Sequence, residues 1–377
     1  MTAKRKHVQL INSPTNEFGL LTCLSRTILR DSDEEFARSL LREGINWDVF
    51  LGSVQYHNLL PLVDRHFSHI EEPSIPTYVY EFLQHRMRTL SFKSQFLVAE
   101  LSRVFSHLTA HGIQAISIKG PVLAYAAYGS LGLRQYGDLD VVVPTRHIHR
   151  IGEVLSEIGY ELHPELASSS QWVRRWRILI GSQVSYVRGR QFFNLDIHTH
   201  VMPLHFRFRP DAAELIQRST TLDLGAEAFS FPEPELMLQI LCFHGHKNRW
   251  ETLKYVCDVA ELVHSFPNLD FGSVIDEAKS RGGYEILLIG LSLANRVLDA
   301  PVPELVHSNL RVHKAVQVTV NSILERLPHQ YILGTVGFKD RIRLQFSTHG
   351  SIRAKARYAS VAGLRRTMVW NKDAVAN

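Results

Sequence analysis

The sequence has no long hydrophobic run and no low-complexity tract. No stretch of its 377 residues reaches the roughly 18 consecutive apolar residues that a membrane-spanning helix requires. The first residues, Met1 to Ser13, mix basic and polar side chains and lead into no apolar core of signal-peptide length. We therefore expect no membrane span and a cytoplasmic location.

The chain is also poor in cysteine. Cys23, Cys242 and Cys257 are far apart, and none belongs to a C-x-x-C pair of the kind that binds zinc or cycles between thiol and disulfide. The H-E-x-x-H signature of zinc proteases is absent as well. We expect three reduced, buried thiols.

What the chain does have is enough apolar material for a substantial core, since 45% of its residues are hydrophobic and 21% are charged. This length and composition predict two domains, or three smaller ones. The net charge is +5, and nine Lys or Arg residues lie from Lys339 to Lys372 against only Asp340 and Asp373. Such a segment suits nucleic acid or phosphate, and it equally suits a solvated basic surface.

The first third of the chain predicts helices. Ser32 and Glu35 have the spacing of a capping box for a helix that should end at Gly44. A long amphipathic run from Tyr78 to Ala110 then predicts a single helix. Residues 1–110 are therefore expected to form an N-terminal helical region.

The periodicity changes after this run. Alternating apolar and polar residues predict a strand at 113–118, and Pro121 suits the first turn of a helix that ends before Gly129. A second strand is expected at 138–143, followed by a helix over 145–158. This alternation of strand and helix predicts an α/β or α+β unit.

A β-hairpin is predicted next, because two β-rich runs, 184–187 and 192–197, flank Gly189 and Arg190. The sheet should therefore have at least four strands. Further helices are expected at 236–243, 253–264, 284–297 and 314–327. The expected divisions are 111–232 for the central core, 233–330 for a C-terminal helical domain and 331–377 for a basic C-terminal segment.

Two carboxylates lie on the second strand of this core. In Arg134-Gln-Tyr-Gly-Asp138-Leu-Asp140, the two Asp residues are two positions apart, so they face the same side of a strand. Two adjacent anionic side chains need a counterion, and Mg²⁺ takes hard oxygen ligands that it often shares with substrate phosphates. A solvated strand entrance with two exposed Asp residues is the alternative.

A turn that can receive phosphate precedes this strand. Lys119 and Gly120 connect the strand ending at Ile118 to the helix that begins at Pro121. Backbone N–H groups at a helix N-terminus favour anions, and Lys119 adds a positive charge. The same turn is also compatible with a purely structural role.

A third carboxylate lies on the second strand of the hairpin. In Asn194-Leu-Asp196-Ile-His198, Asp196 and His198 share one face of the strand. Three strand-borne carboxylates suit a two-metal phosphoryl-transfer site, in which one ion polarises the nucleophile and the other the leaving pyrophosphate. A polar edge strand would have the same pattern.

The histidines leave another interpretation open. A zinc or iron hydrolase draws its ligands from histidine and carboxylate side chains. Residues of that kind in the second half of the chain are His198, His200, His244, His246 and Asp258.

Taken together, these motifs resemble the DNA polymerase β-like nucleotidyltransferase superfamily. Within it, the chain is similar to an uncharacterised nucleotidyltransferase family with a Lys-Gly turn followed by Arg-x-x-x-Asp-x-Asp. The similarity is strongest over 116–144 and extends through Leu195-Asp196-Ile-His198 and His244-Gly-His-Lys-Asn-Arg-Trp250. The helical start, with Trp47-Asp48, His57 and Pro61, is also similar to the N-terminal region of that family.

The resemblance implies an α+β fold, with a polymerase β-like mixed sheet and helices flanked by N-terminal and C-terminal helical regions. It implies that Asp138, Asp140 and Asp196 bind Mg²⁺, with Mn²⁺ as the alternative ion. Asp196 would also orient or deprotonate the hydroxyl of an acceptor.

The resemblance further implies that Lys119 and Gly120 contact a triphosphate and that Arg134 neutralises charge on it. The sequence departs from many members of the superfamily at Pro121, which follows Gly120 where they have Ser or Gly. Proline offers neither a hydroxyl nor an N–H. Phosphate contact at this turn should therefore depend more on Lys119.

The expected reaction transfers NMP from an NTP, expected to be ATP, to a hydroxyl-bearing acceptor and releases pyrophosphate. A small molecule, a peptide, a protein or an RNA end would all serve as acceptor. Two alternatives stay open. One is a non-catalytic nucleotide- or RNA-binding protein that uses the basic C-terminal segment, and the other is a His/Asp metallohydrolase.

Overall fold

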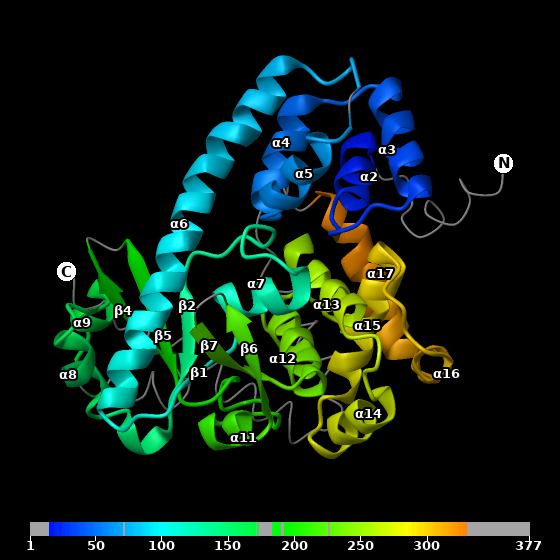
Figure 1. Cartoon of the computed structure of the whole chain (residues 1–377). Coiled ribbons are helices and arrows are strands. Elements are labelled where there is room, and N and C mark those ends of the chain that lie inside the picture. Colours follow the sequence, from blue (N-terminus) through cyan, green and yellow to red (C-terminus); the bar gives the residue numbers. More distant parts are fainter. Residues whose placement is uncertain are drawn as a thin grey trace, which may run out of the picture.

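The chain has an α+β fold in which a five-stranded mixed sheet lies on one side of the molecule and a helical bundle on the other (Figure 1). The computed structural model describes residues 15–70, 72–170, 172, 183–189, 192–224 and 227–329. The expected basic segment at 331–377 lies outside these residues. None of the described helices combines the length and the apolar character needed to cross a membrane.

Helices form the described part of the chain up to Ala110. Their bounds are α2 Asn16–Cys23, α3 Asp31–Glu43, α4 Trp47–Tyr56, α5 Leu60–Phe67 and α6 Thr77–Ala110. The 34-residue helix α6 runs from beside α4 and α5 down across the sheet (Figure 1). It begins one residue before the prediction and ends where predicted, because its apolar stripe is long and uninterrupted.

The capping box predicted from Ser32 and Glu35 is wrong. Helix α3 begins at Asp31, so Ser32 already lies within its first turn. The Asp33 carboxylate accepts a hydrogen bond from the backbone N–H of Arg30 at 3.4 Å, and this contact holds the helix start instead. Because Asp33 is buried and paired with Arg26 at 2.9 Å, tertiary contacts have shifted the start of the helix by one position.

The sheet has the strand order β1-β2-β5-β4-β3. Strands β2 and β5 pair in parallel, and the other neighbouring pairs are antiparallel. The strands are β1 Ile116–Ser117, β2 Leu139–Val142, β3 Glu161–Leu162, β4 Gln183–Arg188 and β5 Phe193–His198. The predicted hairpin is therefore confirmed as β4 and β5.

Two elements of the core are shorter than predicted. Strand β1 covers two residues, because its antiparallel register with β2 would place the residue at 114 opposite Pro144, which has no N–H for the ladder. The helix expected from Thr145 splits into a 3-10 turn at Thr145–His147 and the short helix α8 at Ile151–Ser156. The N-cap residue of this turn is Pro144, not Thr145, and its side chain makes no capping bond, so nothing local holds a full first turn there.

Several elements were not predicted. A second hairpin pairs β6 with β7 and lies beside α7 and β1, where it helps to cover the sheet. The additional elements between residues 164 and 312 are α9 Pro164–Ala167, α11 Ala212–Gln217, β6 Ser219–Leu224, β7 Glu227–Pro232, α14 Phe271–Ser280 and α16 Glu304–Val312. Most are short, and short elements offer too few periods to be recognised from sequence.

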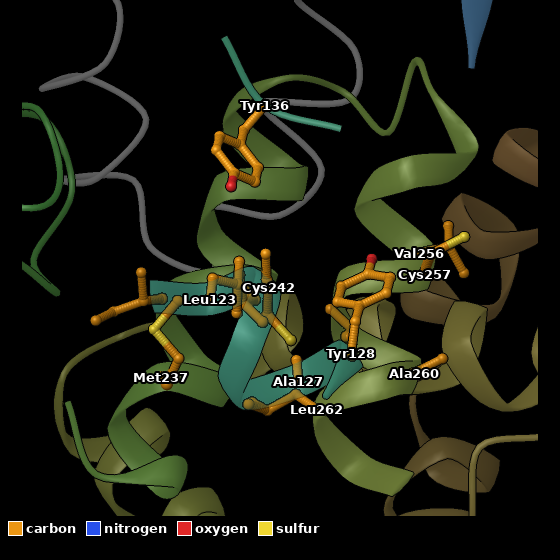
Figure 2. Packing of buried hydrophobic residues seen from close by; sticks show 14 of the residues in the cluster. Leu123, Ala127, Tyr128, Tyr136, Met237, Cys242, Val256, Cys257, Ala260 and Leu262 are labelled. Atoms are coloured by element: carbon orange, nitrogen blue, oxygen red, sulfur yellow. The ribbon is translucent and has the colours of Figure 1, made fainter. Parts of the chain in front are cut away.

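The C-terminal helices form the bundle that supports the core. They are α12 Pro234–Lys247, α13 Leu253–Ser265, α15 Tyr284–Leu298 and α17 Lys314–Arg326, followed by a 3-10 turn at Leu327–His329. Helix α7, Gly120–Tyr128, packs on this bundle. Figure 2 shows Leu123 beside Cys242 of α12, and Ala127 and Tyr128 close to side chains of α13. The helix that begins after Lys119 is therefore anchored on its buried face.

Buried polar contacts join the N-terminal helices to α13. His57 Nδ1 accepts a hydrogen bond from the backbone N–H of Leu253, the first residue of α13, at 3.0 Å. The Glu261 carboxylate accepts bonds from the backbone N–H and the hydroxyl of Thr27 at 3.0 and 2.6 Å. The N-terminal helices thus provide a cap for the helix that carries part of the site described below.

Burial lowers the pKa of His57 from 6.5 to about 4, so the imidazole is neutral in the folded protein at neutral pH. The unfolded chain binds a proton at His57 more readily than the folded protein does. The free energy of unfolding is therefore unaffected by this group above pH 6.5, and it decreases as the pH falls from 6.5 toward 4. Between pH 7 and pH 4.5 this loss amounts to about 2 kcal/mol in the free energy of unfolding, and we expect His57→Gln to remove it, measured by urea unfolding at the two pH values. His69→Gln, at an exposed histidine, is the control. Equal pH dependence in wild type and His57→Gln would contradict this assignment.

Candidate active site

The three carboxylates expected to bind metal come together at one end of β2 and β5. Asp140 on β2 pairs in register with Asp196 on β5, and parallel neighbours in register have their side chains on the same face. Asp138 directly precedes β2, two residues before Asp140. Asp140 is 5% exposed, Asp196 is half-buried and Asp138 is exposed.

Asp140 has two cationic or donor partners. Lys119 Nζ lies 3.2 Å from its Oδ1, and His198 Nε2 lies 2.9 Å from the same oxygen. Burial alone would raise the pKa of Asp140, but the ammonium of Lys119 and the bond from His198 hold it well below its ordinary value. Asp140 is therefore a carboxylate anion at neutral pH.

Asp138 has the opposite electrostatic situation. Its surface is accessible, yet protein atoms replace much of its hydration, and this loss together with the charge of Asp140 raises its pKa. Asp196 adds repulsion, while Lys119 and Lys254 partly offset it. Three carboxylates at this spacing destabilise one another, and a bound cation would relieve that repulsion.

The Lys119–Gly120 turn lies directly against this cluster. Gly120 has a φ of +61°, and a Cβ on it would lie 3.3 Å from the carbonyl oxygen of Asp138. Only glycine fits this combination of left-handed backbone and close approach without strain. The turn is therefore shaped to hold the start of α7 beside Asp138, and it places the Lys119 ammonium on Asp140.

Arg134 does not stand free in the site. Its Nε and Nη2 donate to the two oxygens of Asp258 on α13 at 2.7 and 2.9 Å, and both side chains are buried. The hydroxyl of Tyr128 donates to the same carboxylate at 2.7 Å. Burial favours neutral forms, yet the charge and bonds of Arg134 keep the pKa of Asp258 below its ordinary value. The expected contact of Arg134 with triphosphate stays a prediction.

A family model described as an uncharacterised nucleotidyltransferase matches residues 43–299, more than half of the chain. The chain belongs to this family. Placement in the polymerase β-like superfamily is consistent with that membership, and the membership supports a nucleotidyl-transfer role. No curated protein matches the chain in sequence.

Two residues of this nucleotidyltransferase face the site without having been predicted there. Lys254 in the first turn of α13 interacts electrostatically with Asp138, Lys119 and Arg134. Burial and then the charge of Arg134 lower its pKa to about 8, against the opposing effects of Asp258 and Asp138. Among the described residues Lys254 has no ion-pair partner. Lys254 follows an irregular turn and belongs to no motif, so the sequence alone did not indicate that it faces the site.

The second residue is His244 on α12. Burial and then the charge of Lys119 lower its pKa well below the ordinary value, so its ring is neutral at neutral pH. The ring stacks edge-on against Tyr255 with centroids 5.2 Å apart. The sequence indicated His244 only as part of a general histidine set.

The turn between α12 and α13 aligns these residues. Arg249 and Trp250 both have left-handed backbones, with φ of 59° and 53°. The Trp250 ring is fully buried and packs on Gly245, where any side chain would collide with it. A strained backbone of this kind persists only where tertiary packing fixes it, here the indole ring.

The nucleotidyltransferase does not assemble the histidine set expected of a hydrolase. Asp258 is taken by Arg134, and His200 contacts Thr199 at 3.2 Å. In the described part of the chain, the residue groups compatible with a metal ion are Asp140–Asp196–His198 and His107–His111–Glu157. Only His198 of the proposed hydrolase ligands therefore joins a metal-compatible group.

The Arg134–Asp258 pair gives a test of its structural role. Arg134→Met leaves a buried carboxylate without its cation, so we expect a loss of about 3–5 kcal/mol in the free energy of unfolding. Asp258→Asn should cost a similar amount, and the double variant should cost less than the sum of the two. Urea unfolding measures all three.

The exposed pair of Arg311 and Glu304 provides the matched control for this cycle. Arg311→Met should cost far less than Arg134→Met, because exposed ion pairs contribute little. If Arg134→Met cost no more than Arg311→Met, Arg134 would not be a structural cation.

Proposed function

We propose that this chain catalyses metal-dependent transfer of NMP from an NTP to a hydroxyl-bearing acceptor, with release of pyrophosphate. The observation that carries the proposal is the register of β2 and β5, which sets Asp140 beside Asp196 with Asp138 two residues away. The Lys119–Gly120 turn lies within contact of the same cluster. ATP is the first nucleotide to test, and Mg²⁺ the first ion.

The residues suit a divalent cation. Asp138, Asp140 and Asp196 supply hard carboxylate oxygens, the ligand type that Mg²⁺ prefers, and Asp140, Asp196 and His198 have ligand atoms within 4.8 Å of one another. A bound divalent ion would neutralise charge that develops on the phosphates. His198 holds Asp140 by a 2.9 Å bond and so fixes the orientation of that carboxylate.

The triphosphate would bind beside the carboxylates. Lys119, whose Nζ lies 3.2 Å from Asp140, would donate to phosphate oxygens, and Gly120 would bring the N-terminus of α7 close to them. Lys254 contributes a second ammonium from α13. Arg134 is paired with Asp258 and holds the loop before β2 against α13, so the two lysines carry the phosphate contact. These side chains replace the hydroxyl and N–H that Pro121 lacks.

The chain's own residues account for the reaction as follows. The acceptor oxygen attacks the α-phosphorus in line, a new phosphorus–oxygen bond forms, and the bond to the β-phosphate oxygen breaks. Asp196 orients the acceptor hydroxyl and takes its proton. Lys119 and Lys254 stabilise the negative charge that the pyrophosphate carries away.

Replacing the carboxylates tests the proposal. Incubation with NTP labelled at the α-phosphate, Mg²⁺ and a cell extract should transfer label to an acceptor. Asp140→Asn or Asp196→Asn should reduce transfer by at least about a hundredfold, because each removes a cation ligand. EDTA should abolish transfer, and added Mg²⁺ should restore it.

Asp276→Asn, at an 81%-exposed side chain on α14, is the matched control and should leave transfer unchanged. Thermal unfolding of each variant shows that the fold persists. Label transfer that survives both Asp138→Asn and Asp140→Asn would refute the site.

Lys254 gives a separate test of the phosphate contact. Lys254→Met should weaken binding of a non-hydrolysable ATP analogue by about ten- to hundredfold, because one charge-assisted contact is lost. Wild-type affinity should fall as the pH rises above about 8, where the ammonium loses its proton, and the variant should lack this fall. Isothermal titration calorimetry measures both effects. Lys279→Met, at a half-exposed lysine on α14, is the control, and equal affinities for the two variants would exclude Lys254 as a ligand.

A further inference from the structure

Three phenylalanine rings form an exposed aromatic ridge on the surface. Phe92 and Phe96 project from α6, and Phe192 directly precedes β5. Their exposed fractions are 64%, 44% and 45%. The ring centroids of Phe92 and Phe96 are 5.0 Å apart, and those of Phe96 and Phe192 are 6.1 Å apart. Single exposed apolar residues are common on protein surfaces, but exposed aromatic rings that contact one another are not. The three rings therefore indicate a binding surface.

The aromatic ridge lies near the N-terminal ends of β2 and β5, close to the residue that precedes Asp138. Lys93, between the two α6 rings in sequence, has its Nζ 3.3 Å from where a Cβ would stand on Gly137, the residue before Asp138. Phe192 precedes the strand that carries Asp196, four residues later. A ligand that extends from the aromatic ridge past Lys93 would therefore reach the backbone beside Asp138.

The surroundings of the aromatic ridge are positive. No Asp or Glu occurs between Phe82 and Ala99, whereas this stretch contains Arg86, Arg88 and Lys93. The next acid along α6, Glu100, is buried and accepts bonds from Arg103 and Arg188. Its charge is therefore neutralised and does not reach the surface.

Aromatic rings interleaved with basic side chains suit a strand of nucleic acid. Bases stack on exposed rings whatever their sequence, and the backbone phosphates pair with Lys and Arg. The exposed neighbours of these rings on α6 are polar or small, namely Arg88, Ser91, Gln95 and Ala99. An interface for an apolar helix of a partner would instead show aliphatic anchors at helical spacing.

We propose that the aromatic ridge binds the acceptor and that this acceptor is a single-stranded nucleic acid, whose terminal ribose hydroxyl reaches Asp196. The inference rests on the proposed nucleotidyl transfer. In that step the terminal hydroxyl oxygen attacks the α-phosphorus, a phosphodiester bond forms, pyrophosphate leaves and the proton passes to Asp196. The product is the strand lengthened by one nucleotide.

Binding is tested with the full-length protein and a fluorescein-labelled 12-nucleotide oligo(A) RNA, measured by fluorescence anisotropy. Replacing both Phe92 and Phe96 by Ala should weaken binding at least about tenfold, because two stacking surfaces are lost. Replacing both by Trp should retain binding. Lys93→Gln should reduce the slope of log affinity against log salt concentration by about 0.7.

Tyr78→Ala is the matched control, since Tyr78 is a 49%-exposed aromatic residue on the same helix but near its start. It should leave binding unchanged. The proposal is overturned if wild type does not bind the RNA, or if Tyr78→Ala weakens binding as much as the double Phe variant. It is also overturned if the double Phe variant changes only self-association in sedimentation.

A second measurement separates this inference from the proposed function. Asp140→Asn should bind the RNA like wild type but fail to extend it with α-labelled NTP. RNA binding that depends on the Phe residues, without extension by any NTP, would support the ridge as a nucleic-acid surface and refute it as the acceptor site. Label transfer to another acceptor without RNA binding would refute the ridge and leave nucleotidyl transfer standing.

Discussion

Asp140 and Asp196 stand side by side because β2 and β5 pair in parallel with these residues in register. Like charges at adjacent positions of a sheet repel each other, so this pairing is unfavourable unless positive charge or a donor is supplied. Lys119 and His198 supply it, both at the same oxygen of Asp140. The conformation of the Lys119–Gly120 turn follows from this requirement, since the turn must bring an ammonium to the sheet while α7 starts within contact of Asp138.

A second layer of charge lies behind this pair. Arg134 and Asp258 neutralise each other in a fully buried setting, with Tyr128 as a third partner. Burying two charges costs free energy, and good geometry with additional bonds offsets that cost. The pair also ties the loop before β2 to α13. His57 from the N-terminal helices caps helix α13 in turn. Distant parts of the chain therefore hold α13 in place beside the carboxylates.

The long regular elements could be predicted from the sequence. Helix α6 was located to within one residue, because its apolar stripe continues over many turns. Helix α7 was bounded correctly by Pro121 and Gly129, whose backbone preferences mark a start and an end. The capping box at Ser32 failed because Asp33 is held by a tertiary ion pair, which local spacing cannot reveal.

The site was predictable in its residue types and only partly in its contacts. Alternation indicates that Asp140 and Asp196 each face one side of a strand, but it does not say that those strands are neighbours. Arg134 and Asp258 are 124 residues apart in the chain, and their pairing depends on how helices pack. Lys254 belongs to no motif, so only the folded chain brings it to Asp138.

The turn at Arg249 and Trp250 fixes more than the course of the backbone. A helix rotates by about 100° for each residue, so the number of residues in this connection sets the azimuth of everything on α13. One inserted or deleted residue would swing Lys254 away from Asp138 and Asp258 away from Arg134, even if each helix stayed intact. The number of residues from Asn248 to Thr252 therefore sets the rotation of α13 about its own axis. The geometry of the site depends on this length as well as on the identity of the carboxylates.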